Sequence, residues 1–185
     1  MVENYLNNVH NQFKYYKRLG DRTFAQLKDE DLFWVSDEDA NSIAILVNHL
    51  SGNMISRWTD FLTTDGEKSF RHRDAEFQET IKSREQLLSR WEKGWDCLFK
   101  AIESINESNF ESSIYIRNQK HTITEAVNRQ MMHYAYHIGQ IVFIGRMLKG
   151  AKWESLSIPK GKSKEYKSDK FGKGKHGGYY GDDRQ

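Results

Sequence analysis

The sequence has few of the residues on which several classes of protein depend. It has one cysteine, Cys97, so it cannot form an intramolecular disulfide, a zinc knuckle or a Cys-x-x-Cys redox pair. No apolar run approaches the roughly 18 residues that span a bilayer, and Met1–Gln12 is too polar to be the apolar core of a signal peptide. We therefore expect a cytoplasmic protein without membrane insertion, and any metal site must use His, Asp or Glu.

Proline is also scarce, because Pro159 is the only one in 185 residues. A proline inside a helix removes a backbone hydrogen bond, so long helices can run without a break before this residue. The chain is 37% hydrophobic and 13% aromatic, and buried aromatic rings can supply a compact core. These features favour an all-α fold in one domain of ordinary size.

Charge is unevenly distributed along the chain, whose formal total is +2. Pro159–Gln185 holds eight Lys and Arg against four Asp and Glu, which leaves 2 − 4 = −2 for residues 1–158. This tail has six glycines and almost no aliphatic residues, so it cannot offset its ordering entropy alone. We expect a helical domain at 1–158 and a Lys/Gly-rich tail at 159–185. A solvated tail is the simpler interpretation, and contact with nucleic acid or an anionic surface is the alternative.

Four segments within residues 1–158 show apolar residues at helical spacing. Four helices of this length are typical of a four-helix bundle. The predicted helices cover about Val2–Leu27, Ile43–Leu62 after a cap at Asn41 or Ser42, about Ser83–Ile105, and a last one from the capping box Thr122–Glu125 to a stop near Gly150. The predicted core includes Leu46, Leu50, Trp91, Leu98, Ile102, Val127, Ile141 and Ile144.

The connections between these helices bear on the topology. Residues 63–80 are polar and rich in turn formers and can extend over roughly 50 Å, whereas a 20-residue helix is about 30 Å long. Such a crossover would let the second and third helices run parallel, in up-down-down-up order, although a long loop can also join antiparallel neighbours. Ser112–Thr124 alternates apolar and polar residues around a turn at 117–120, which predicts a short hairpin.

The histidines of the second and fourth helices are the candidate metal ligands. His133 and His137 are four residues apart, so they share one helix face and point into or beside its apolar stripe. His49 lies on the flank of the second helix, and it closes a three-nitrogen site if this flank faces the fourth helix. Three nitrogens would leave a zinc or nickel ion at least one open position. The simpler interpretation of the pair is that polar neighbours satisfy it.

The other candidate residues carry weaker signals. We expect surface positions for His10, His72, His121 and His176. Cys97 lies away from the apolar stripe of the third helix. No histidine lies near it in the sequence, so nothing indicates that it is an activated nucleophile.

Three strings carry a resemblance to a known family: His49–Lys68, Arg71–Phe77 and Asn128–Ile141. With one histidine in the second helix and His-x-x-x-His in the fourth, the chain resembles the DinB/YfiT-like superfamily of metal-binding four-helix bundles. The strings are similar to an uncharacterised branch found mainly in bacilli. The resemblance implies the crossover bundle, and it implies that His49, His133 and His137 bind a divalent ion such as zinc, nickel or iron.

The resemblance implies less about activity. Characterised relatives include S-transferases that use bacillithiol, mycothiol or glutathione, and metal-dependent hydrolases or isomerases. We therefore expect a metal-dependent enzyme, with transfer to a small-molecule thiol cosubstrate as the leading candidate reaction. The alternative is a non-catalytic, structural or stress-related metal-binding protein. Arg57 can hold cosubstrate carboxylates at a pocket rim, or it can serve packing or dimer contacts.

A homodimer without nucleic-acid specificity is the expected assembly. Trp34, Trp95 and Trp153 fall at loop or stripe-edge positions, where a partner could cover them. The lysines of the tail can contact phosphates, but such contacts carry no sequence recognition.

Overall fold

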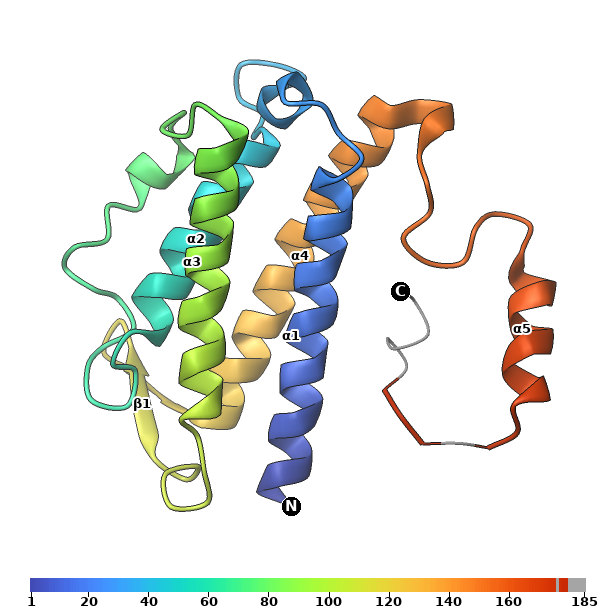
Figure 1. Cartoon of the computed structure of the whole chain (residues 1–185). Helices are drawn as coiled ribbons and strands as arrows, with labels where there is room; N and C mark the ends of the chain where they lie inside the picture. The colour runs from blue at the N-terminus through green and yellow to red at the C-terminus, as the bar shows by residue number, and fades with distance from the viewer. Residues whose placement is uncertain (176, 180–185) are drawn as a thin grey trace.

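The computed structural model describes residues 1–175 and 177–179 (Figure 1). The described chain is mostly helical with one two-stranded sheet, in agreement with the predicted all-α class. His176 and residues 180–185 of the predicted tail lie outside the described residues. The elements are α1 (Val2–Phe24), η1 (Glu30–Phe33), α2 (Ile43–Trp58), η2 (Asp74–Phe77), α3 (Arg84–Glu103), β1 (Ser113–Ile116), β2 (Gln119–Thr122), α4 (Ile123–Lys149), η3 (Gly150–Lys152) and α5 (Ser163–Gly172).

Side-chain caps fix where the long helices begin. Ser42 and Ser83 accept hydrogen bonds from backbone N–H groups three residues ahead, at the starts of α2 and α3. The predicted capping box is confirmed, because Glu125 N donates to Thr122 Oγ1 and Thr122 N donates to Glu125 Oε2. Helix α2 ends at Trp58, earlier than predicted, because Thr59 adopts an extended conformation and Asp60 after it has a φ of 45°.

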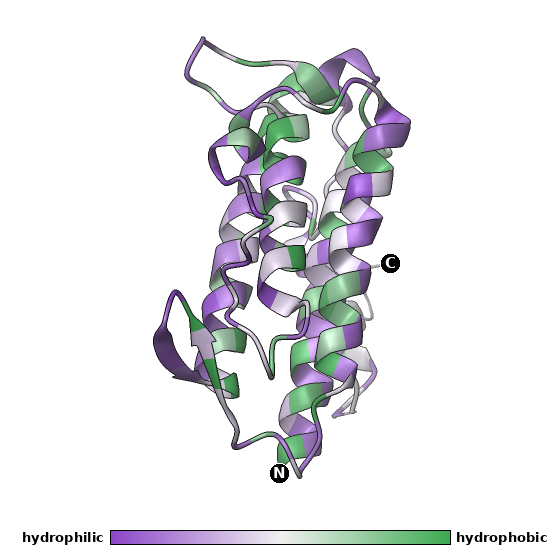
Figure 2. Ribbon diagram, turned by 90° about the vertical axis from the view of Figure 1, so that its left-hand side faces the viewer, coloured by the Kyte–Doolittle hydropathy of each residue, from purple (hydrophilic) through white to green (hydrophobic). Residues whose placement is uncertain are grey.

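The long helices lie side by side, and the chain changes direction between them. In Figure 1, α1 and α4 run upward, while α2 and α3 both run downward. Residues 59–83 return along the outside of α2 to connect the lower end of α2 to the upper end of α3. Packing is most extensive between α2 and α3 and between α1 and α4. The helices carry hydrophobic and hydrophilic residues on alternating parts of their surfaces (Figure 2).

Aromatic side chains dominate the core. Trp91, Trp95, Phe13 and Tyr134 are almost completely buried and contact one another edge to face or at a tilt. The predicted core is confirmed for Leu46, Leu50, Trp91, Leu98, Ile102, Val127 and Ile141, whereas Ile144 is only partly buried at its margin.

One expectation about aromatic packing is corrected. Trp95 is fully buried against Phe13 and Trp91, so it is not available to a partner subunit as predicted. Gly20 in α1 lies against this tryptophan cluster, and a Cβ atom there would lie 2.5 Å from the Trp91 ring. The glycine therefore makes room for the tryptophan where α1 meets α3.

The hairpin β1–β2 is confirmed near its predicted position, and the crossover is tied to it. Arg117 and Asn118 form the turn with φ values of 56° and 60°, as a tight two-residue hairpin requires. Both of their backbone N–H groups donate to the carboxylate of Asp65, at 2.8 and 2.7 Å. Gly66 N also donates to the carbonyl of Tyr115. Residues 65 and 66 thus anchor the start of the crossover.

The basic tail forms one further helix among its described residues. Helix α5 is drawn apart from the long helices in Figure 1, and Lys162 pairs with Glu165 at its start. None of the helices among the described residues combines the length and the apolar character needed to cross a bilayer.

The core makes a quantitative prediction for two leucines of α3. Leu98 is fully buried, whereas Leu88 is 37% exposed. Leu98→Ala should lower the free energy of unfolding by about 2–5 kcal/mol because it leaves a cavity, and Leu88→Ala should cost less than half as much. Urea unfolding of both variants measures the difference, and similar costs would contradict this description of the core.

Candidate metal centre

His49 reaches the interior because α2 is buried on almost all sides. Fourteen of its 16 residues are buried, between α3, α4 and the crossover. A flank position on this helix is therefore not at the surface, and His49 is only 3% exposed. His133 and His137 lie one turn apart on α4 and are partly buried. The structure thus brings all three predicted residues together from two helices.

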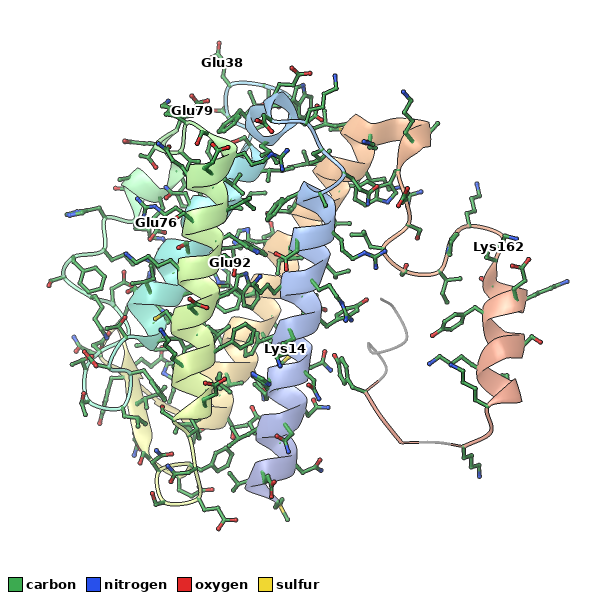
Figure 3. The ribbon with its side chains drawn as sticks, in the orientation of Figure 1. Lys14, Glu38, Glu76, Glu79, Glu92 and Lys162 are labelled. Atoms are coloured by element: carbon green, nitrogen blue, oxygen red, sulfur yellow. The ribbon has the colours of Figure 1, made fainter. Side chains whose placement is uncertain are left out.

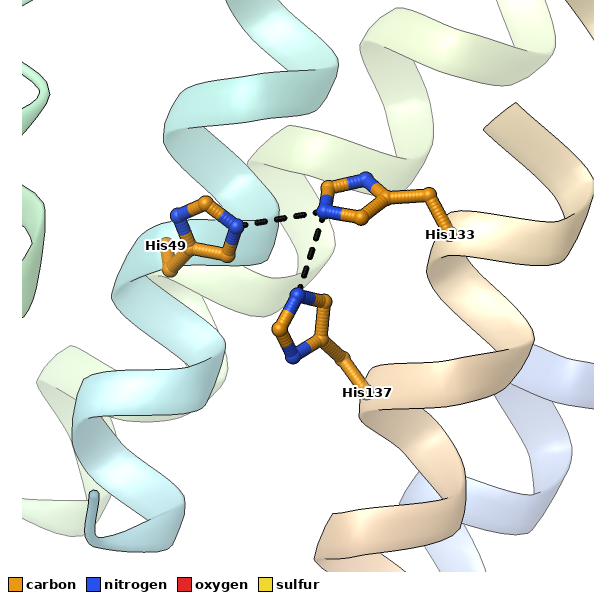
Figure 4. A group of neighbouring side chains, drawn as sticks. All are labelled: His49, His133 and His137. Carbon is orange, nitrogen blue, oxygen red and sulfur yellow. Dashed lines mark hydrogen bonds between the residues drawn. The ribbon is translucent and has the colours of Figure 1, made fainter. Parts of the chain in front are cut away.

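The three imidazole rings converge on one point (Figure 4). His133 Nε2 lies 3.3 Å from His49 Nε2 and 3.1 Å from His137 Nε2, and the three ligand atoms all lie within 4.8 Å of one another. Tetrahedral coordination at 2.0–2.1 Å separates ligand nitrogens by about 3.3 Å. Two of the three separations are close to this value, so the rings can hold one ion between them. This is the one such group of His, Cys, Asp or Glu found in the part of the chain that the structure describes.

The outer nitrogens of two rings are held by neighbouring side chains. His49 Nδ1 lies 3.0 Å from Glu76 Oε2, and His137 Nδ1 lies 2.9 Å from Gln140 Oε1. Both oxygens are acceptors, so each Nδ1–H donates and each Nε2 keeps its lone pair toward the centre. Metal-binding histidines usually have such partners, which fix the ring orientation.

Glu76 belongs to the crossover (Figure 3), and its side chain is buried. Arg71 donates to both of its oxygens, from Nε at 2.7 Å and from Nη2 at 2.9 Å. Burial raises the pKa of the Glu76 carboxyl, but the hydrogen bonds from Arg71 and His49 outweigh it and leave the pKa below its usual value. Glu76 is therefore ionised at neutral pH and can only accept.

A glycine of α2 makes room for this carboxylate. A Cβ atom at Gly52 would overlap Oε1 of Glu76, so any larger residue would displace the carboxylate from this position. The roles of Glu76, Arg71 and Gly52 were not predicted from the sequence. The sequence shows both features, the string Arg71–Phe77 and a glycine in the middle of the second predicted helix. Nothing in their spacing along the sequence indicates that they are in contact.

Aromatic rings cover parts of the histidine cluster. Phe77 stacks on His49 with ring centroids 4.6 Å apart, and it is 39% exposed. Tyr136 packs edge-on against His137 with centroids 5.0 Å apart. The cluster is therefore bordered by two exposed aromatic residues.

Arg57 is not at an open rim, contrary to one of the two roles considered for it. Its side chain is buried, donates to the carbonyl of Gly66 at 2.5 Å and pairs with Glu67 at 3.2 Å. Ser56 Oγ donates to the same carbonyl. These contacts favour the packing role, because they fasten the start of the crossover to the end of α2.

The remaining described histidines and the cysteine lie outside the cluster. His10 packs against Phe99 and His72 is exposed. His121 is not at the surface as expected: it is buried on β2, where its ring contacts the Gln119 carbonyl and Arg129. Cys97 is partly buried, 3.6 Å from Thr59 Oγ1.

Burial favours the uncharged form of His133 and His137. Desolvation lowers the pKa of His133 to about 3, with further lowering by His137 and His49. Desolvation also lowers the pKa of His137, although its hydrogen bond with Gln140 opposes this. Neutral imidazole is the form that binds metal ions, so the site is prepared for a cation at neutral pH.

Metal-free protein should lose stability as the pH falls from about 6.5 toward 3. The folded-state pKa of His133 is near 3 and the ordinary value is 6.5, so the unfolded chain binds more protons in this window. Urea unfolding at pH 7 and pH 5 measures the loss, and His133→Gln, which does not titrate, should show a smaller one. An equal loss of unfolding free energy in the wild type and in His133→Gln would contradict the lowered pKa of His133.

Comparison of the chain with known proteins identifies a family match. No curated protein and no solved structure matches the chain significantly. Residues 1–162 match the family described as "Protein of unknown function (DUF1572)", which covers all four long helices and the three histidines. The chain belongs to this DUF1572 family.

Proposed function

We propose that the protein binds one divalent metal ion through His49, His133 and His137 and uses it in catalysis. The observation that carries the proposal is the convergence of three imidazole nitrogens within 4.8 Å, two of them oriented by Glu76 and Gln140. Neutral imidazoles suit zinc, nickel and ferrous iron.

A metal ion with three protein ligands keeps an open coordination position. Structural zinc sites in proteins almost always have four protein ligands, whereas catalytic sites have three and leave a position for water or substrate. The cluster contains three such residues among those described, and Glu76 is already engaged by His49 and Arg71. This donor set supports a catalytic role.

The candidate reaction is thiol S-transfer, with a bacillithiol-type cosubstrate. A bound divalent ion would supply the Lewis acid that lowers the pKa of a thiol. Tyr136, Gln140 and Phe143 line a groove of about 410 Å³, and Gln140 touches His137 directly. This groove gives a cosubstrate a place next to the cluster.

A non-catalytic metal-binding role, structural or stress-related, is the second candidate. The histidines come from two helices, α2 and α4, and Glu76 adds the crossover. A bound ion would therefore hold three segments together, which benefits stability without any reaction.

We infer further that the fold is the DinB/YfiT-like bundle of up-down-down-up order, with a domain at 1–158 and a separate tail at 159–185. The helix directions in Figure 1 and the crossover at 59–83 support this inference. A cytoplasmic location and a homodimer without nucleic-acid specificity complete the proposal.

Metal content tests the ligands directly. His133→Ala/His137→Ala should abolish metal binding while leaving helical circular dichroism largely intact, because both rings are only partly buried. The control His10→Ala/His72→Ala removes two histidines outside the cluster and should keep one ion per chain. Stoichiometric metal in the first variant would overturn the assignment.

Glu76→Gln tests the partner of His49. Removing the charge that orients the ring should weaken metal affinity by about 10- to 100-fold. Glu79→Gln, three residues away on an exposed side chain, is the matched control and should bind as wild type. Competition with a chromophoric chelator measures the metal affinities of both variants. Equal affinities would show that Glu76 does not support metal binding.

Turnover separates the two functional candidates. The metal-loaded protein is screened with bacillithiol, mycothiol and glutathione against electrophilic substrates. Turnover that is lost in His133→Ala/His137→Ala supports the enzyme. A metal that resists chelation and accepts no exogenous ligand, without any turnover, supports the structural role.

A further inference from the structure

Helix α4 carries an uncovered apolar stripe on the side facing solvent. Met132, Tyr136, Phe143 and Met147 are 68%, 63%, 67% and 48% exposed. At 3.6 residues per turn these four positions lie along one face, over about 22 Å of helix. A fully exposed aromatic side chain offers on the order of 150–250 Å² of surface. The stripe is therefore a continuous apolar patch, larger than the single apolar residues that are scattered over most protein surfaces.

Between Met132 and Met147 the only charged residue is Arg146, at the end of the stripe beside Met147. Residues 130–145 contain no Asp, Glu, Lys or Arg at all. Gly139 lies near its middle, and a Cβ atom there would meet nothing within 4 Å. Another backbone can therefore approach α4 closely at this point. A partner recognised by charge does not fit this surface, whereas an apolar helix does.

The order of the stripe residues identifies the partner. Met132 and Met147 are equidistant from a point between Gly139 and Gln140, and so are Tyr136 and Phe143. The sequence of side chains thus reads nearly the same in both directions: methionine, aromatic, gap, aromatic, methionine. In a twofold interface, residue i contacts residue j and j contacts i. A second copy of α4, running antiparallel, would match the two methionines and the two aromatics.

We propose that two copies of this chain pair through α4, antiparallel, around a twofold axis at Gly139–Gln140. Tyr136 then lies against Phe143 of the partner subunit, and Met132 lies against Met147 of the partner subunit. Tyr136, Gln140 and Phe143 also line the groove beside His137, so the partner helix forms its outer wall. The pairing does not depend on a bound metal ion.

Molecular mass tests the interface. Sedimentation equilibrium of the full chain at micromolar concentration should give twice 21.8 kDa. Phe143→Asp should halve the mass, with unchanged circular dichroism and metal content, because the side chain is exposed within one subunit. The control Phe171→Asp changes a residue of α5 that is 83% exposed and should leave the dimer intact.

The alternatives give different results. A monomeric wild type, or a dimer that survives Phe143→Asp, would overturn the proposal. A dimer released by Phe171→Asp instead would assign the contact to the tail. A monomeric wild type that binds neutral phosphatidylcholine vesicles would assign the stripe to a lipid surface.

A charge pair tests the antiparallel register. Met132→Lys/Met147→Glu places opposite charges against each other across the proposed axis, whereas Met132→Lys/Met147→Lys places like charges there. The first variant should remain dimeric and the second should become monomeric. A parallel pairing, with Met132 against Met132 of the partner subunit, would make both variants monomeric and would contradict the register.

Discussion

A buried carboxylate determines the geometry around the candidate metal centre. Taking the charge of Glu76 out of water is costly unless it is paired and hydrogen-bonded. Arg71 supplies two of those bonds and His49 the third. The carboxylate can occupy this place only because Gly52 leaves the surface of α2 open. Satisfying one charge thus holds the crossover against α2 and turns the Nε2 of His49 toward α4.

The site and the fold are consequently coupled. His133 and His137 belong to α4 and His49 to α2. The orientation of His49 depends on Glu76, which lies in the crossover that connects α2 to α3. An ion that binds only the folded chain stabilises it in proportion to the logarithm of its concentration. Metal binding should therefore order the crossover as well as join the helices, whichever of the two functions holds. The dimer proposed at α4 adds a wall to the adjacent groove without contributing a ligand.

Local signals in the sequence predicted much of the fold. The caps at Ser42 and Thr122 lie beside the residues whose backbone they satisfy, so short patterns reveal them. His133 and His137 were identified in the same way, from a spacing of one helical turn. His49 needed the helix packing or the family resemblance, because its own helix placed it only on a flank. Glu76 could not be predicted, since the crossover has no periodicity and its partners are distant in sequence. Trp95 was misplaced because stripe edges in a small bundle can still be buried.

X-ray absorption spectroscopy of the zinc-loaded protein reports the donor atoms around the ion, so it can show whether the three histidines bind it. We expect three imidazole nitrogens at about 2.0–2.1 Å, together with an oxygen or nitrogen donor that an added exogenous ligand replaces. A sulfur at about 2.3 Å, which only Cys97 or a methionine could supply, would contradict this expectation. So would a shell with fewer than three imidazoles, because the convergence of His49, His133 and His137 would then have another cause.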